Sequence, residues 1–308
     1  MITVLAALVP VFLLIVMGYG LRRRLLKEDA HWIGLERLVY FVLFPALLIE
    51  TTARANFAKV PVGGVGGALL LAVLTMAALC LALRPLLQSA AGIDGPAFTS
   101  VFQGATRWQT FIGLAVANNL YGDDGVALAS VAMVAMIPVL NIMSVSVLAH
   151  FARPQRLAWP YLLLAIAQNP FIWACAVGLA LNLSQVPLPQ VVHDFADALG
   201  RSSLAIGLLV VGAGLQVGEL IRPGVAASLT VFLKLVAMPA FAISYALLFG
   251  LSGVNLAVVA VSASVPAASN SYILAKQLGG DAPLIAQILT LQTILAAVTM
   301  PVIVSLVR

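Results

Sequence analysis

Long apolar segments recur along the whole chain and are separated by short polar stretches. Each segment has about 20 residues, the length that an α-helix needs to cross the hydrocarbon core of a bilayer. A helix of this length in a soluble protein would have a polar face, which these segments lack. We predict ten membrane-spanning helices, at residues 3–20, 33–52, 64–83, 97–119, 125–149, 159–182, 201–219, 226–250, 255–277 and 283–306.

Two of the predicted spans are interrupted by polar sequence. The fourth contains Gln103-Gly-Ala-Thr-Arg-Trp-Gln-Thr110, and the ninth contains Ser264-Val-Pro-Ala-Ala-Ser-Asn-Ser271. Hydrocarbon offers the backbone no hydrogen-bond partner, so irregular backbone occurs there only where it is buried in protein or lines a cavity. Matched interruptions in the two halves of a chain are typical of the binding site of a secondary transporter. The pattern therefore favours transport.

The predicted spans divide into two groups of five, within residues 1–150 and 157–308. An odd number of crossings in each half inverts the second half relative to the first. The interrupted spans take the fourth place in each half. We therefore predict an all-α integral membrane protein made of two inverted five-helix repeats, with spans 4 and 9 broken.

Composition and charge agree with a membrane protein. The chain is 62% hydrophobic and 9% charged, with a mean hydropathy of +1.09, which excludes an ordinary soluble domain. Nine Lys and Arg residues lie in connections on one side of the predicted bundle and four on the other. This asymmetry places the first side in the cytoplasm and both termini outside it. We expect a multi-pass protein of the cytoplasmic (inner) membrane, surrounded by lipids and without a nucleic-acid partner.

The sequence contains no pattern typical of an enzyme. Cys80 and Cys175 both lie in apolar spans, where a cysteine is usually a small buried side chain. No metal-ligand spacing, phosphate-binding loop or Ser-His-Asp order is found. We expect no catalytic residue, no metal and no cofactor.

Arg107 is the first candidate for substrate binding, because a charge inside a span costs about 2.5 kcal/mol or more. Its planar fork of donors suits a carboxylate, and the alternative is a structural ion pair or helix cap. Trp108 would stack on a flat substrate or simply pack. Gln109 and Thr110 are neutral hydrogen-bonding residues, and Gly113 permits a close approach or a bend.

The second interruption offers a different set of groups. Pro266 removes a backbone donor, and Ser269, Asn270 and Ser271 favour non-helical backbone. A helix that begins after such a break presents free N–H groups to an anion. The alternative is a kinked helix whose polar side chains bond to neighbouring helices.

Two further charges and one connection lead to separate expectations. Glu50 is either a group that takes up and releases a proton or the partner of Arg54, about one helical turn later, and we favour pairing with Arg54. Lys234 lies several residues inside its span, and we expect it to extend to the headgroups in preference to coupling an ion. Residues 183–200 predict a proline-containing turn followed by an amphipathic segment on the outer surface.

Several local sequences, taken in their order and spacing, resemble the auxin efflux carrier family, which includes bacterial transporters and the plant PIN-FORMED carriers. The resemblance covers essentially the whole chain. It rests on Phe44-Pro-Ala-Leu-Leu48, Pro138-Val-Leu-Asn-Ile-Met-Ser-Val145, Asn169-Pro-Phe-Ile172, Gly212–Gly214, and Pro266 with Asn270.

The resemblance implies a scaffold of spans 1, 2, 6 and 7 and a transport domain of the other six. Broken helices 4 and 9 would cross within the transport domain. Family members are expected to carry small organic anions, auxin-like or dicarboxylate, by an elevator movement, often as homodimers. Carried over by position, the site is Arg107–Thr110, Asn141 and Pro266–Ser271.

The chain departs from the family pattern at three places. The family usually has an Asn near the position of Trp108 and a Pro at the position of Ala115, and this chain has neither. The plant carriers also have an acidic residue in span 3, whereas span 3 of this chain has none. Substrate class and proton coupling are therefore left open. Two other functions also remain open, namely a sodium symporter of the bile-acid type and a membrane-embedded sensor that binds a metabolite without moving it.

Overall fold

The structure is a computed structural model that describes residues 2–54, 62–152, 170–184, 188–217 and 224–307. All regular elements in these ranges are helices, and η1 and η3 are wide π-helical turns inside longer helices. The elements are α1 (Ile2–Arg24), α2 (Asp29–Leu38), η1 (Val39–Leu43), α3 (Phe44–Arg54), α4 (Val62–Ala91), α5 (Gly95–Thr106), α6 (Thr110–Phe151), α8 (Pro170–Ser184), α9 (Gln190–Ala213), α10 (Val225–Phe232), η3 (Leu233–Ala237), α11 (Met238–Leu248), α12 (Gly253–Ser264), α13 (Asn270–Leu278) and α14 (Ala282–Leu306).

Seven helical stretches in the described ranges are long and apolar enough to cross a membrane. The predicted all-α membrane protein is thus confirmed in its class. Helix α6 has 42 residues and would be about 60 Å long if it were straight, about twice the thickness of the hydrocarbon core. Gly122 interrupts it with φ 58° and ψ −143°, next to the exposed Asp123 and Asp124. The predicted turn between spans 4 and 5 is therefore found at Gly122, where two helical parts of α6 meet at a kink. Predicted span 159–182 lies partly outside the described residues, and α8 is its described part.

The predicted amphipathic segment before span 7 is not an element separate from that span. Helix α9 runs without interruption from Gln190 to Ala213, so the amphipathic residues form the first turns of the same helix. Gly200, which could have ended it, packs against α3, where a Cβ atom would lie 3.0 Å from Cδ1 of Leu47. This packing keeps the backbone helical through the glycine.

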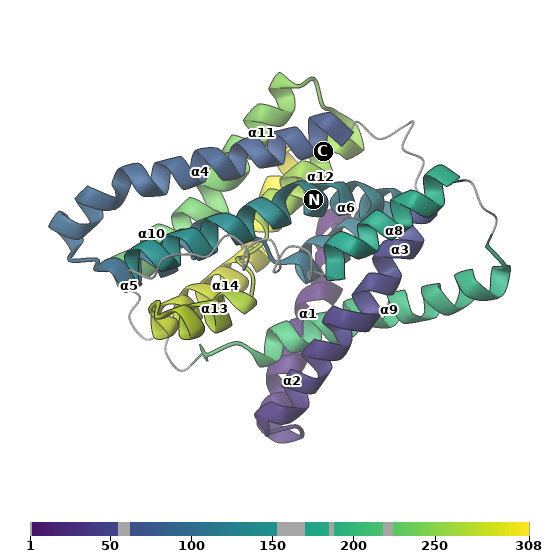
Figure 1. The fold of residues 1–308 in the computed structure, drawn as a ribbon, viewed down its shortest axis with the longest axis horizontal. Helices are drawn as coiled ribbons and strands as arrows, with labels where there is room; N and C mark the ends of the chain where they lie inside the picture. The colour runs from purple at the N-terminus through teal and green to yellow at the C-terminus, as the bar shows by residue number, and fades with distance from the viewer. Residues whose placement is uncertain (1, 55–61, 153–169, 185–187, 218–223, 308) are drawn as a thin grey trace.

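The helices form two groups that meet along α6 (Figure 1). One group contains α1, α2, α3, α8 and α9, in which α3 packs against α8 and α9, and α1 packs against α9. The other contains α4, α5 and α10 to α14, in which α4 packs against α11, and α12 packs against α11 and α14. Helix α6 contacts members of both groups. The broken ninth span, α12 and α13, belongs to the second group. The broken fourth span consists of α5, which is in the second group, and the first part of α6, which lies between the groups.

Close backbone contact between α1 and α9 depends on glycine. A Cβ atom on Gly18 would collide with the carbonyl oxygen of Leu209, whereas a Cβ atom on Gly20 would meet nothing within 4 Å. We expect Gly18→Ala to force the helices apart and to lower the free energy of unfolding by about 1–3 kcal/mol. Thermal denaturation in detergent measures this effect, and Gly20→Ala on the same helix is the matched control. Equal stability of the two variants would contradict the proposed role of this contact.

Candidate substrate site at the helix crossover

Both predicted interruptions are complete breaks in the helices. Helix α5 ends at Thr106, and Arg107 has an extended backbone with φ −68° and ψ 159° before α6 begins. Helix α12 ends at Ser264, and Val265 is likewise extended with φ −68° and ψ 151°. The prediction of two broken spans is confirmed, and the alternative of a kinked but continuous helix is wrong.

The two breaks are hydrogen-bonded directly to each other. The backbone N–H of Gln109 donates to the carbonyl oxygen of Pro266 at 3.0 Å. The side-chain Nε2 of Gln109 donates to Oγ of Ser269 at 2.7 Å. These residues are about 160 positions apart in sequence, so the bonds show that the two breaks lie against each other, and we call the region where they meet the crossover. Gln109 and Ser269 therefore hold the crossover together.

A third element, α14, completes this arrangement through Gln292. Its Oε1 accepts from the backbone N–H of Ala267 at 2.9 Å, and its Nε2 donates to the carbonyl oxygen of Gly104 at 2.9 Å. Gln292 is fully buried, so these bonds satisfy backbone groups that water does not reach. Gln292 was not among the predicted site residues, although an amide in the middle of an apolar span is a recognisable signal.

Arg107 lies at the centre of the crossover and is 5% exposed. Its Nη2 donates to Oδ1 of Asn270 on α13 at 2.9 Å and to Oδ1 of Asn141 on α6 at 3.3 Å. Nε and Nη1, which carry the other three N–H bonds, have no acceptor among the described residues. No acidic side chain in the described ranges pairs with Arg107, so the structural ion pair is not found there.

Further buried polar groups without partners lie on the same segments. Gln103 precedes Arg107 by one turn, Ser144 follows Asn141 by one turn, and Ser271 is next to Asn270. The side-chain amide of Gln103 and the hydroxyls of the two serines make no hydrogen bond to a described residue, and all three residues have 0% exposure. Buried polar groups are normally satisfied, so these orphans, on the segments that carry Arg107, Asn141 and Asn270, are candidate ligand-binding groups. Gln103 and Ser144 were not among the predicted site residues.

Trp108 and Gly113 form a supporting contact. The indole lies against Gly113, where a Cβ atom would be 2.9 Å from Cζ2 of Trp108. The predicted close approach at Gly113 is therefore made by this indole. Thr110 is the half-buried first residue of α6, and no side-chain hydrogen bond is found for it within the described part of the chain.

The start of each second half-helix also lies at the crossover. Helix α6 begins after Gln109 and α13 after Ser269, and neither has a side-chain cap. Uncapped helix N-termini present N–H groups and a partial positive charge. Asn270 is exposed whereas Arg107 is buried, so the polar groups extend from the interior to the surface. Arg107 and the partial positive charge at these two helix N-termini would favour a negatively charged ligand.

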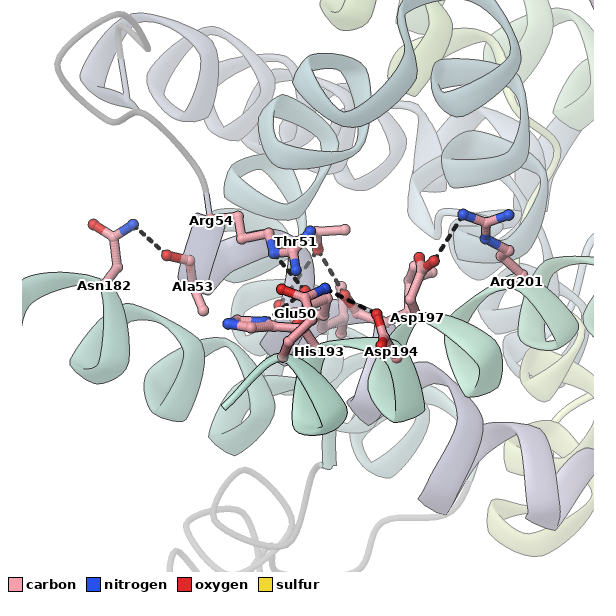
Figure 2. A network of polar contacts seen from close by, with 12 residues as sticks. Glu50, Thr51, Ala53, Arg54, Asn182, His193, Asp194, Asp197 and Arg201 are labelled. Carbon is pink, nitrogen blue, oxygen red and sulfur yellow. Dashed lines mark hydrogen bonds and ion pairs between the residues drawn. The ribbon is translucent and has the colours of Figure 1, made fainter. Parts of the chain in front are cut away.

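Glu50 is part of a separate polar network that joins α3 to α9 (Figure 2). Its Oε1 pairs with Nε of Arg54 at 2.6 Å, and both carboxylate oxygens lie 2.9 Å from Nδ1 of His193. The predicted pair with Arg54 is confirmed. The contact with His193 was not predicted, because it brings together residues 143 positions apart. Glu50 thus holds two helices together and lies outside the crossover.

We expect Glu50→Ala to lower the free energy of unfolding by about 1.5–3 kcal/mol, because a buried carboxylate with two cationic or hydrogen-bonding partners is lost. The matched control is Asp197→Ala on α9, which removes an exposed pair with Arg201 and should cost about 0.5 kcal/mol or less. Thermal denaturation checks the difference. A transport defect in Glu50→Ala without loss of stability would instead indicate a coupling role.

Lys234 does not extend to the headgroups, and that prediction is wrong. The residue is 2% exposed and lies in η3, in the middle of the helix formed by α10, η3 and α11. Helices α5, α12 and α14 contact this turn, so the side chain is enclosed by protein.

Comparison with known proteins agrees with this architecture. A search of curated proteins finds no match. A family model described as "Membrane transport protein", the domain of the auxin efflux carriers, matches residues 3–158 and again residues 152–304. The two segments together cover nearly the whole chain, which confirms the resemblance seen in the sequence. The chain belongs to the membrane transport protein family of the auxin efflux carriers.

Proposed function

We propose that this membrane transporter carries small organic anions and that Arg107 binds their carboxylate. The observation that carries the proposal is the buried guanidinium with three N–H bonds directed at no described acceptor. A charge in this environment is stabilised when an anion with matching geometry binds to it. Asn141, Asn270 and Ser271 surround the carboxylate in this proposal, together with Gln103 and Ser144.

The proposed architecture has ten spans in two inverted repeats, residues 1–150 and 157–308. The first helix group (α1, α2, α3, α8 and α9) would be the scaffold, and the second group, with α6, would be the transport domain. The helices pack more extensively within each group than between the groups, where α1 contacts α14, and this supports the division. An elevator movement would carry the crossover past the scaffold, with the scaffold forming a homodimer. The Lys and Arg asymmetry supports a cytoplasmic membrane location with both termini outside the cytoplasm.

The proposal is tested by flux in proteoliposomes loaded with aliphatic and aromatic carboxylates, with and without a sodium gradient. We expect saturable uptake of one carboxylate class, accelerated by the same unlabelled compound on the opposite side. An uncharged amide of equal size is the matched control and should not be carried. Sodium-dependent uptake would favour a symporter, and binding without flux would favour a sensor. Transport of the amide at the same rate would overturn the carboxylate site.

A further inference from the structure

A small cavity lies beside the crossover, on the side of α4 and η3. Its volume is about 10 Å³, which is room for about one water-sized species. Its lining consists of apolar side chains and of four residues with a polar group. These four are Thr106, Trp108, Lys234 and Ser262.

Three of these four polar groups are hydrogen-bond donors without acceptors, whereas the hydroxyl of Thr106 donates to the carbonyl oxygen of Phe102 at 2.7 Å. Nε1 of Trp108 and Oγ of Ser262 have no partner among the described residues, and both side chains are at least nine-tenths buried. The Lys234 ammonium makes no hydrogen bond or ion pair within the described part of the chain. An ammonium and an indole N–H can only donate, so what they lack is an acceptor.

No described element around Lys234 supplies a negative charge. Helices α4, α5, α11, α12 and α14 contain no Asp or Glu, and their titratable groups are Cys80, Arg84 and Tyr245. Tyr245 is hydrogen-bonded to Thr75, and the acidic residues of α6 are at the exposed turn beside Gly122. A buried ammonium without a counter-charge is costly, and none of the described residues around Lys234 supplies one, which favours a bound anion as its partner.

We propose that Lys234, Trp108 and Ser262 form a binding site for a single halide-sized anion, of which chloride is the abundant example. A single-atom anion needs less room than a carboxylate group, which has two oxygens, and the neighbouring side chains would have to move slightly to admit it into a space that now has room for about one water. The apolar remainder of the lining suits a weakly hydrated monovalent ion. This site is distinct from the Arg107 site, and its existence does not depend on which substrate the transporter carries.

The first test measures the melting temperature of the purified protein in sodium chloride and in sodium gluconate at equal ionic strength. We expect chloride to raise it by about 5 °C at about one hundred times its dissociation constant, and to continue raising it with the logarithm of concentration. Lys234→Met should remain folded, because an uncompensated buried charge is replaced by an apolar side chain, and should lose the chloride response. Lys276→Met, which removes an exposed charge, should retain it.

A second test uses bromide, a halide that quenches indole fluorescence on contact. We expect a saturable quenching component that is lost in both Trp108→Phe and Lys234→Met. Equal melting temperatures in chloride and gluconate would overturn the proposal and leave a water molecule in the cavity. A chloride response that survives in Lys234→Met and disappears in Arg107→Ala would also overturn it, because the ion would then occupy the substrate site.

Discussion

We expect Arg107→Ala to abolish the proposed carboxylate transport, with a loss of apparent affinity of roughly 100-fold or more. A buried cation that forms charge-assisted hydrogen bonds to a carboxylate contributes about 3 kcal/mol or more to binding, and each 1.4 kcal/mol is about tenfold in affinity. The variant should unfold at the same or a higher temperature, because it removes a charge that no acidic group in the described ranges balances. Isothermal calorimetry and proteoliposome flux measure the two effects.

Two further variants separate charge from geometry at this position. Arg107→Lys keeps the charge but replaces a planar fork by a point charge, so we expect an intermediate loss of affinity. Arg201→Ala removes an arginine whose side chain is 82% exposed on α9 and should leave transport unchanged. Wild-type transport by Arg107→Ala would exclude the guanidinium as the group that binds the anion.

The sequence allowed the breaks to be predicted because polar residues in hydrocarbon carry a strong physical signal. The run from Gln103 to Thr110 and the run around Pro266 could not both continue as ordinary apolar helices. The resemblance then placed Asn141 with Arg107 and Asn270, and the structure brings these three side chains together. Local composition and position in the chain thus sufficed for the centre of the site.

The parts that were missed depend on contacts between distant residues. Gln292 bonds to Gly104, 188 positions away, and nothing in its own span identifies that partner. The depth of Lys234 was misjudged from its distance to the end of the span, whereas burial depends on the helices that pack around η3. Helix α9 was predicted to start too late because the packing of Gly200 against Leu47 is likewise non-local.

The second large effect is expected at Gln292, whose amide bridges α5 and the break after α12. Gln292→Met preserves the shape of the side chain but leaves the N–H of Ala267 and the carbonyl of Gly104 unpaired in the protein interior. Each unsatisfied buried group costs about 1–3 kcal/mol, so the free energy of unfolding should fall by about 2–6 kcal/mol.

Transport by Gln292→Met should fall more than stability alone explains, because Arg107 is held by the segments that this amide joins. The matched control is Thr293→Val on the same helix, where the buried hydroxyl donates only to Leu289 of its own helix. We expect that control to transport normally in proteoliposomes and to melt close to the wild-type temperature. If both variants behaved alike, the crossover would be held by the bonds of Gln109 to Pro266 and Ser269 without help from α14. A selective loss of transport in Gln292→Met would instead show that the contact with α14 is needed to hold the two breaks in place relative to each other. The proposed anion site requires this, because Arg107 lies in one break and its partner Asn270 follows the other.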